Sequence, residues 1–170
     1  IWVLTKVAGV TTPATSNWQL RDSERIIQGN DALLGRKHLL VAITRLRNEA
    51  LILPDTLDYL ASHVDAIVAY DDASTDRTVD ILREHPKVAL IVANGSWEED
   101  VAARKLAEGR HRGLLLEMAR AELPHDWMFC FDPDERVSED LRGFVGGLGA
   151  DDCDALPVQL FDAYMTPDDH

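Results

Sequence analysis

The sequence predicts an α/β fold in which helices cover both faces of a mainly parallel sheet. Four short, continuous apolar runs predict strands that are buried on both faces, at residues 39–44, 66–70, 88–92 and 127–131. Helical signals occupy the segments between successive runs. Because strands that alternate with helices favour parallel pairing through crossover connections, we expect an α/β sandwich.

Each predicted helix is supported by apolar spacing or by a terminal signal. Pro54 suits a first helical turn, and apolar residues follow it along one helical stripe at positions 57, 60, 61 and 64. The next helix is expected over residues 77–84, with Ser74 or Asp76 as its cap and Pro86 beyond its end.

The second half of the chain predicts two more helices and one more strand. Residues 96–99 (SWEE) form a capping box for a long helical region that runs toward Glu122, with an expected interruption near Gly109 or Gly113. Ser138 is expected to open another helix, whose first turn holds two acidic residues. Residues 155–161 are a candidate fifth strand.

The chain divides into two parts of unequal clarity. Residues 1–36 carry no regular pattern and are treated as an N-terminal extension of unknown role, whereas residues 37–170 form the predicted domain. No apolar run reaches the ~20 residues that span a bilayer. Cys130 and Cys153 show no disulfide or zinc spacing, so a reducing, cytoplasmic location is expected. The sequence leaves open a targeting segment upstream of Ile1.

Charge narrows the classes of partner. The net charge is −13, with 46% hydrophobic residues in a chain of 170. This charge argues against a nucleic-acid or acidic-membrane partner, because phosphate backbones are bound by an excess of Lys and Arg. A phosphate ligand held through a cation remains compatible with this charge.

Polar clusters follow three of the predicted strands. They lie at residues 44–49 (TRLRNE), 71–76 (DDASTD) and 132–135 (DPDE). Neighbouring strand ends lie only ~5 Å apart, and ligands of parallel sheets bind outside the carboxyl ends of the strands. We therefore expect the three clusters to line one crevice.

These clusters allow more than one chemistry. Asp132 and Asp134 suit Mg²⁺ or Mn²⁺ with substrate phosphates, or form a solvated acidic turn. Asp72 binds a metal, accepts from a base or ribose, or caps the next helix. Arg45 and Arg47 contact a diphosphate or pair with the surplus acids. Cys130 is expected to be a small buried side chain, and His111 alone indicates a structural histidine.

Four segments together resemble the family 2 glycosyltransferases, which have the GT-A fold. Residues 46–50 (LRNEA), 68–76 (VAYDDASTD), 110–114 (RHRGL) and 129–135 (FCFDPDE) are similar to motifs of that family, in the family's order. The resemblance implies a GT-A-like, Rossmann-type α/β/α sandwich that is incomplete at its C-terminal side, with the acceptor half missing. Ala73 replaces the usual Gly, so its turn must avoid positive φ or tolerate strain, and His111 replaces the usual Asn.

The resemblance also implies residue roles. Asp72 would bind the nucleobase, Glu49 or Arg45 would lie near the base or ribose, and Arg110 would approach the donor phosphates. Asp132 would lie near the ribose and metal, and Asp134 would coordinate Mg²⁺ or Mn²⁺.

The implied reaction is an inverting, hexosyltransferase-type transfer from a nucleotide-diphospho-sugar to a saccharide or other hydroxyl acceptor, as in polysaccharide biosynthesis. Its catalytic base would lie beyond residue 170, because Asp162, Asp168 and Asp169 are too close in sequence to Asp134. We expect this chain to bind donor but to transfer sugar poorly.

Other classes fit the sequence less well. A haloacid-dehalogenase-like phosphatase also places Asp-x-Asp after an apolar strand, but it favours Thr or Val where Arg136 stands. A non-catalytic, receiver-like phosphate-binding module needs a late lysine, and the last lysine here is Lys105. A dinucleotide-binding domain is disfavoured because no G-x-G-x-x-G follows a strand.

Overall fold

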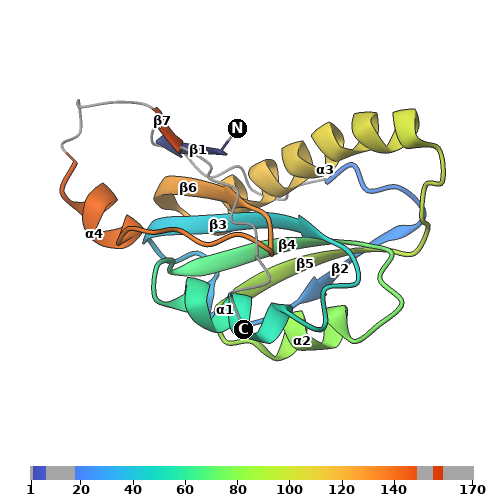
Figure 1. The fold of residues 1–170 in the computed structure, drawn as a ribbon, viewed down its shortest axis with the longest axis horizontal. Helices are drawn as coiled ribbons and strands as arrows, with labels where there is room; N and C mark the ends of the chain where they lie inside the picture. The colour runs from blue at the N-terminus through green and yellow to red at the C-terminus, as the bar shows by residue number, and fades with distance from the viewer. Residues whose placement is uncertain (1, 7–17, 149–154, 159–170) are drawn as a thin grey trace, which may run out of the picture.

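The computed structural model describes residues 2–6, 18–148 and 155–158. These residues form one seven-stranded sheet in the order β2-β5-β4-β3-β6-β1-β7 (Figure 1). The strands are β1 (Trp2–Lys6), β2 (Glu24–Gln28), β3 (His38–Leu46), β4 (Ala66–Asp72), β5 (Val88–Asn94), β6 (His125–Phe131) and β7 (Ala155–Val158).

The four strands predicted from continuous apolar runs form the parallel centre of the sheet. β3 pairs in parallel with β4 and β6, and β4 pairs in parallel with β5. β2, β1 and β7 are added at the two sides in antiparallel orientation. The α/β prediction with a mainly parallel sheet is therefore confirmed.

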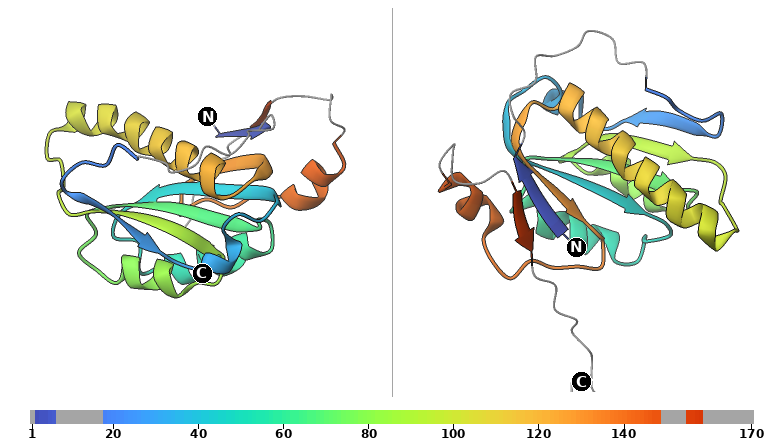
Figure 2. Two further views of the ribbon diagram at one scale, coloured as in Figure 1. Left: turned by 180° about the vertical axis from the view of Figure 1, so that it is seen from behind. Right: turned by 90° about the horizontal axis from the view of Figure 1, so that it is seen from above.

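Helices cover both faces of this sheet. Figures 1 and 2 show α1 (Leu53–Ala61) and α2 (Thr78–Glu84) on one face and α3 (Val101–Glu122) on the other. A short helix, α4 (Leu141–Gly146), packs near β3, and a 3-10 turn, η1 (Asp31–Leu33), precedes that strand. Among the described residues, every helix is too short or too polar to cross a membrane.

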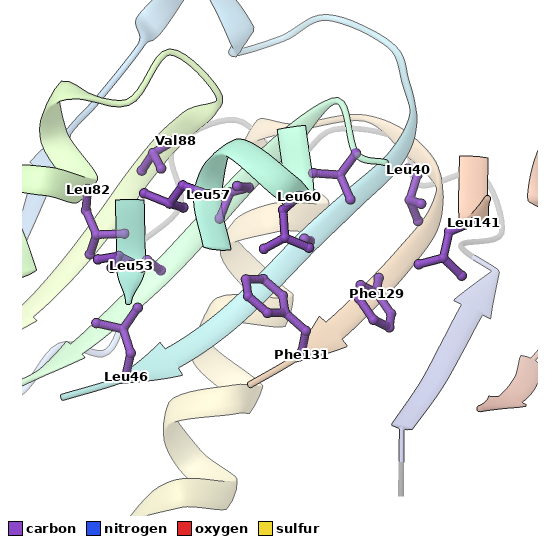
Figure 3. Close-up of a cluster of buried hydrophobic side chains, with 14 of the residues drawn as sticks. Leu40, Leu46, Leu53, Leu57, Leu60, Leu82, Val88, Phe129, Phe131 and Leu141 are labelled. Carbon is purple, nitrogen blue, oxygen red and sulfur yellow. The ribbon is translucent and has the colours of Figure 1, made fainter. Parts of the chain in front are cut away.

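Alternation along the central strands produces two apolar cores. Leu40 and Ala42 of β3 face the core beneath α1 and α2, whereas Val41 and Ile43 face the core beneath α3. Figure 3 shows the first core, where Leu57 and Leu60 of α1 pack against β3 and β6. Because both faces are covered, the strands need continuous apolar sequence, which is the signal that predicted them.

Three details of the predicted helices are wrong. α3 runs without interruption through Gly109 and Gly113. Each glycine costs ~1 kcal/mol relative to Ala, but the buried stripe of the same helix outweighs this cost.

Two helices also begin later than predicted. α3 begins after Asp100, whose side chain accepts from the Ala103 amide, and not at the residue 96–99 capping box. α4 likewise begins after Asp140 rather than at Ser138.

The N-terminal residues contribute structure that the sequence pattern does not reveal. β1 and β2 lie in the segment treated as an extension, yet both belong to the sheet. In β2, only the first residue is buried and three of the other four are exposed, so the strand lacks a buried apolar run. The predicted fifth strand is present as β7; residues 159–161, and the candidates Asp162, Asp168 and Asp169, lie outside the described residues.

Candidate functional site

The carboxyl ends of the parallel strands meet at one edge of the sheet. Because β3 lies between β4 and β6, Arg45 stands opposite Tyr70, and Thr44 stands opposite Phe131. Asp72 at the end of β4 stands opposite Asn94 at the end of β5. The sheet therefore brings the three predicted polar clusters to neighbouring strand ends. Residues of the first two clusters line the pocket found there, whereas residues 132–135 do not.

A polar pocket lies over the ends of β3, β4 and β5. We call it the Arg45 pocket. Arg45, Asp72 and Asn94 come from the strand ends, and Arg104, Ala107 and His111 come from one stripe of α3. Loop residues 21, 23 and 96–98 complete its wall.

Asp72 is held inside the protein by two partners. Arg45 Nη2 donates to Asp72 Oδ2 at 2.5 Å, and Asn94 Nδ2 donates to Oδ1 at 3.0 Å. The Asp72 side chain is only 5% exposed. Asp72 does not cap α2, because Asp76 Oδ1 accepts from the Thr78 amide at the start of that helix. The capping interpretation of Asp72 is therefore wrong.

His111 lies beside this ion pair. Its ring stacks on Tyr70 with 3.9 Å between centroids and 15° between planes. Arg45 Nε donates to His111 Nδ1 at 3.2 Å. Burial lowers the pKa of His111 to about 4, with the nearby Arg45 charge acting in the same direction and the Asp72 charge opposing it. His111 is therefore a neutral member of the pocket wall near pH 7.

Behind the pocket, a buried carboxylate supports Tyr70. Glu24 accepts from the Tyr70 hydroxyl at 2.7 Å and from Arg110 through both carboxylate oxygens, at 2.5 and 2.7 Å. Burial opposes the ionised form of Glu24, but hydrogen bonds from Arg110, the Arg21 amide and Tyr70 lower its pKa to about 2. Arg110 also donates to the Gln19 carbonyl. It does not line the Arg45 pocket, and its expected contact with donor phosphates stays a prediction.

Hydrogen bonds connect the loop after β3 to the loop after β4. The Asn48 amide donates to Ser74 Oγ at 2.9 Å, and Asn48 Oδ1 accepts from the Thr75 amide at 2.8 Å. The amides of Glu49 and Ala50 donate to side chains at positions 78 and 76. Much of the polar sequence in these two clusters thus fixes the loops that carry the site residues.

Ala73 adopts the left-handed backbone conformation, which decides between the two alternatives that the sequence left open. Its φ is 59°, so the turn tolerates positive φ rather than avoiding it. Asn48 has a φ of 56°, which asparagine accepts more readily than alanine does. The backbone strain at Ala73 lies directly after Asp72.

A second polar region follows β6. We call residues 132–135 the acidic turn. Asp132 accepts from Arg112 Nη2 at 3.2 Å; burial raises the pKa of Asp132 despite Arg112, and the Asp134 charge raises it further. Asp134 itself is exposed. Thr56 donates to the Pro133 carbonyl at 2.7 Å and so anchors the turn to α1.

Glu49 belongs to the surroundings of the acidic turn. Burial raises the pKa of Glu49, and the charges of Asp134 and Asp76 raise it further. Glu49 does not line the Arg45 pocket. Its expected position near the base or ribose stays a prediction, but the electrostatics place it among carboxylates.

The acidic turn supplies only part of a metal site. Residues 2–6, 18–148 and 155–158 contain no cluster of three or more His, Cys, Asp or Glu side chains that is arranged to hold a metal. Mg²⁺ is commonly bound by one or two carboxylates together with substrate phosphates. The paired carboxylates Asp132 and Asp134 fit that arrangement.

Several pocket residues were not singled out from the sequence. Asn94 could have been found, because it ends a predicted strand at the same edge. Trp97 also lines the pocket, and the guanidinium carbons of Arg47 and Arg104 lie 3.8 and 4.9 Å from its ring centroid.

Cys130 lies outside the Arg45 pocket and differs from the small buried side chain expected from the sequence. It is only partly buried, and Arg112 Nη1 donates to its sulfur at 2.6 Å.

Comparison with known proteins adds a family match and two relatives. The model of the family described as "Glycosyl transferase family 2" matches residues 42–167. Two proteins described as uncharacterized, from Mycobacterium bovis and Mycobacterium tuberculosis, are each 35% identical over 102 residues. The match covers 60% of this chain and 25% of each relative, so it spans about a quarter of the length of those proteins.

Proposed function

The chain belongs to glycosyl transferase family 2, and we propose that it is the donor-binding part of an enzyme that transfers a sugar from a nucleoside diphosphate to a hydroxyl acceptor. The family match supports a nucleotide-sugar glycosyltransferase in general. The observation that carries the proposal is the placement of the Arg45 pocket and the acidic turn at adjoining strand ends of one sheet.

The two regions suit different parts of such a donor. The Arg45 pocket offers both hydrogen-bond donors and the Asp72 carboxylate, which suits the base and ribose. The acidic turn offers two neighbouring carboxylates, of which Asp134 is exposed, and this suits a cation bound to the diphosphate. A donor extended from β5 across β3 toward β6 would contact both.

The chemistry proposed here follows from charge. Breaking the sugar–phosphate bond builds negative charge on the leaving nucleoside diphosphate, and a divalent ion held by Asp132 and Asp134 would neutralise it. Arg112 holds the Asp132 carboxylate in place. An inverting transfer also needs a base for the acceptor hydroxyl, and we place that base outside the described residues. Transfer of a hexose, a polysaccharide product and a cytoplasmic location stay predictions.

The match to a transferase family favours this proposal over a phosphatase or a receiver-like module. A thermal-shift screen separates the three. We expect a nucleoside diphosphate with Mn²⁺, at about 100 times its Kd, to raise the Tm by roughly 5–10 °C, because a ligand stabilises the state that binds it. A shift with Mn²⁺ plus a small phosphate mimic, and none with nucleotides, would contradict the proposal.

A further inference from the structure

Two hydroxyl groups of α1 hold the backbone on either side of Asp134. Thr56 Oγ1 donates to the Pro133 carbonyl at 2.7 Å. The Tyr59 hydroxyl accepts from the Val137 amide at 2.9 Å and also donates to the Val137 carbonyl. Asp134 is exposed and lies between these two anchored residues. The position of its carboxylate therefore depends on the backbone that the two hydroxyls hold.

The sequence of the acidic turn favours one compact backbone conformation. Asp132 and Pro133 occupy the first two positions of a four-residue turn, where these residue types are preferred. The Glu135 amide donates to the Asp132 carbonyl at 3.1 Å and closes the turn. Proline has no N–H, so its carbonyl is the only backbone group through which Pro133 can be anchored by a hydrogen bond. Thr56 donates to that carbonyl.

The helix that carries both hydroxyls is itself anchored in the apolar core. Thr56 and Tyr59 are three positions apart in α1, so they lie on the same side of the helix. Leu53, Leu57 and Leu60 of the same helix are at most 2% exposed and belong to the core beneath α1 (Figure 3). The acidic turn is therefore fixed relative to the core of the protein.

A third contact from α1 reaches the same segment but contributes less. Arg136 Nη2 donates to Asp55 Oδ2 at 2.5 Å, and Arg136 Nη1 donates to the Glu135 carbonyl at 2.9 Å. The side chains of this ion pair are 39% and 82% exposed, and exposed ion pairs add little stability. Thr56, in contrast, is fully buried, and Tyr59 is half-buried. The two hydroxyls are therefore the stronger restraints on the turn.

We propose that Thr56 and Tyr59 are positioning residues that hold the acidic turn in the conformation that presents Asp134 to the donor's cation. The inference rests on the proposed function. Groups that orient metal ligands typically contribute 10- to 100-fold to metal affinity. Mg²⁺ requires near-ideal octahedral geometry, whereas Ca²⁺ accepts flexible geometry. A loosened turn should therefore weaken Mg²⁺ binding more than Ca²⁺ binding.

The test is calorimetry of the chain with UDP and with GDP, each without metal, with Mg²⁺ and with Ca²⁺. In Tyr59→Phe and in Thr56→Val, which each remove a hydroxyl, Mg²⁺-dependent nucleotide affinity should fall about tenfold. Ca²⁺-dependent affinity should fall less. Metal-free affinity should not change, because neither residue lines the Arg45 pocket. Thr56→Ser keeps a hydroxyl and should restore most of the Mg²⁺-dependent affinity.

Leu57→Val is the matched control for lost stability. Leu57 is buried in the core beneath the same helix and has no polar group for the turn. The substitution should lower the Tm, as the loss of a buried hydrogen bond does, without changing the ratio of Mg²⁺ to Ca²⁺ affinity. In the metal-free protein, hydrogen exchange of the Glu135 amide should be several times faster in Tyr59→Phe and Thr56→Val and unchanged in Leu57→Val.

Three results would overturn the inference. They are wild-type Mg²⁺-dependent affinity in both folded hydroxyl variants, an equal loss of affinity with and without cation, and a drop in the Mg²⁺-to-Ca²⁺ ratio that is as large in Leu57→Val. The second result would show a structural role only. If Thr56→Val does not fold, Tyr59→Phe decides alone. A wild type that binds neither nucleotide, or binds both without any cation effect, would overturn the proposed function together with this inference.

Discussion

The Arg45 pocket and the acidic turn lie at neighbouring strand ends, yet their charges are balanced differently. In the pocket, Asp72 is buried and receives hydrogen bonds from Arg45 and Asn94. In the acidic turn, Asp134 is exposed and raises the pKa of both Asp132 and Glu49. In the pocket, the carboxylate charge of Asp72 is balanced by partners within the protein, whereas the acidic turn carries surplus negative charge.

This difference separates two ways of building a binding site. Internal pairing fixes side chains before a ligand arrives, so changes in the pocket should lower both stability and affinity. Surplus like charge costs stability and is relieved when a cation binds. Changes in the acidic turn should therefore lower cation-dependent affinity while leaving the free energy of unfolding unchanged or slightly higher.

The largest expected effect tests the support behind the pocket. Glu24→Gln should lower the free energy of unfolding at pH 7 by on the order of 3 kcal/mol, because the buried charge that pairs with Arg110 is lost. The ionised Glu24 carboxylate contributes its full stabilisation above pH 4.5, the ordinary pKa of a glutamate. This stabilisation is lost as the pH falls toward the pKa of Glu24 in the folded protein, about 2. Urea unfolding at several pH values measures it.

Glu84→Gln is the matched control, since Glu84 is exposed on α2. It should change stability by less than about 0.5 kcal/mol. Equal pH dependence of unfolding for wild type and Glu24→Gln between pH 4.5 and 2 would show that the pocket is not held by this buried charge.

The next effect tests the acidic turn. Asp134→Asn should lower Mn²⁺-dependent nucleotide affinity by at least 10- to 100-fold, because a hard cation loses an anionic ligand. Its free energy of unfolding should not fall, because a like charge near Glu49 is removed. Calorimetry with and without Mn²⁺ checks the first point, and Glu139→Gln is a control with the same change in charge. Unchanged affinity in the folded variant would remove the metal role.

A smaller effect is expected for the carboxylate of the pocket. Asp72→Ala should weaken nucleotide binding about tenfold even without metal, because the ligand loses a charged acceptor. Arg45 also loses its ion-pair partner, so stability should fall. Asp80→Ala breaks only an exposed ion pair with Arg83 and should cost under about 1 kcal/mol. If Asp72→Ala and Asp80→Ala bind nucleotide equally well without metal, Asp72 has no part in recognition.

The smallest expected effect concerns the loop that carries Asp72. Ala73→Gly should raise the free energy of unfolding by up to about 1 kcal/mol, because glycine adopts a φ of 59° without a Cβ clash. Asn48→Gly at a φ of 56° should not stabilise, since it loses the acceptor for the Thr75 amide. Chemical denaturation compares the two. Stabilisation of the second variant and not the first would contradict the strain assigned to Ala73.

The parallel centre of the fold follows from local sequence. β3, β4, β5 and β6 are covered on both faces, and burial on both faces requires the continuous apolar runs that predict them. β1 and β2 could not be predicted in this way. β2 is a short strand in antiparallel pairing at the edge of the sheet, with exposed residues in its centre. Its position depends on pairing with β5, which no local pattern encodes.

The boundaries of the helices likewise depend on tertiary packing and not on local sequence signals alone. The residue 96–99 capping box and the glycines of α3 are local signals, and the structure overrides both. The Ser96 amide donates instead to Asn94 Oδ1 at 3.1 Å, next to the site. Burial of the α3 stripe against β3 and β4 contributes more than the local preferences of single residues.

For the site, the sequence by itself determined which strand ends carry polar side chains, and hence where Arg45, Asp72, Asp132 and Asp134 lie. Only the tertiary structure decided their partners. Arg45 forms an ion pair with Asp72, which is 27 residues away in the sequence, and Arg110 forms one with Glu24, which is 86 residues away. The physical reason is that charges pair with whatever lies within a few ångströms in the folded protein, and sequence spacing does not fix that distance.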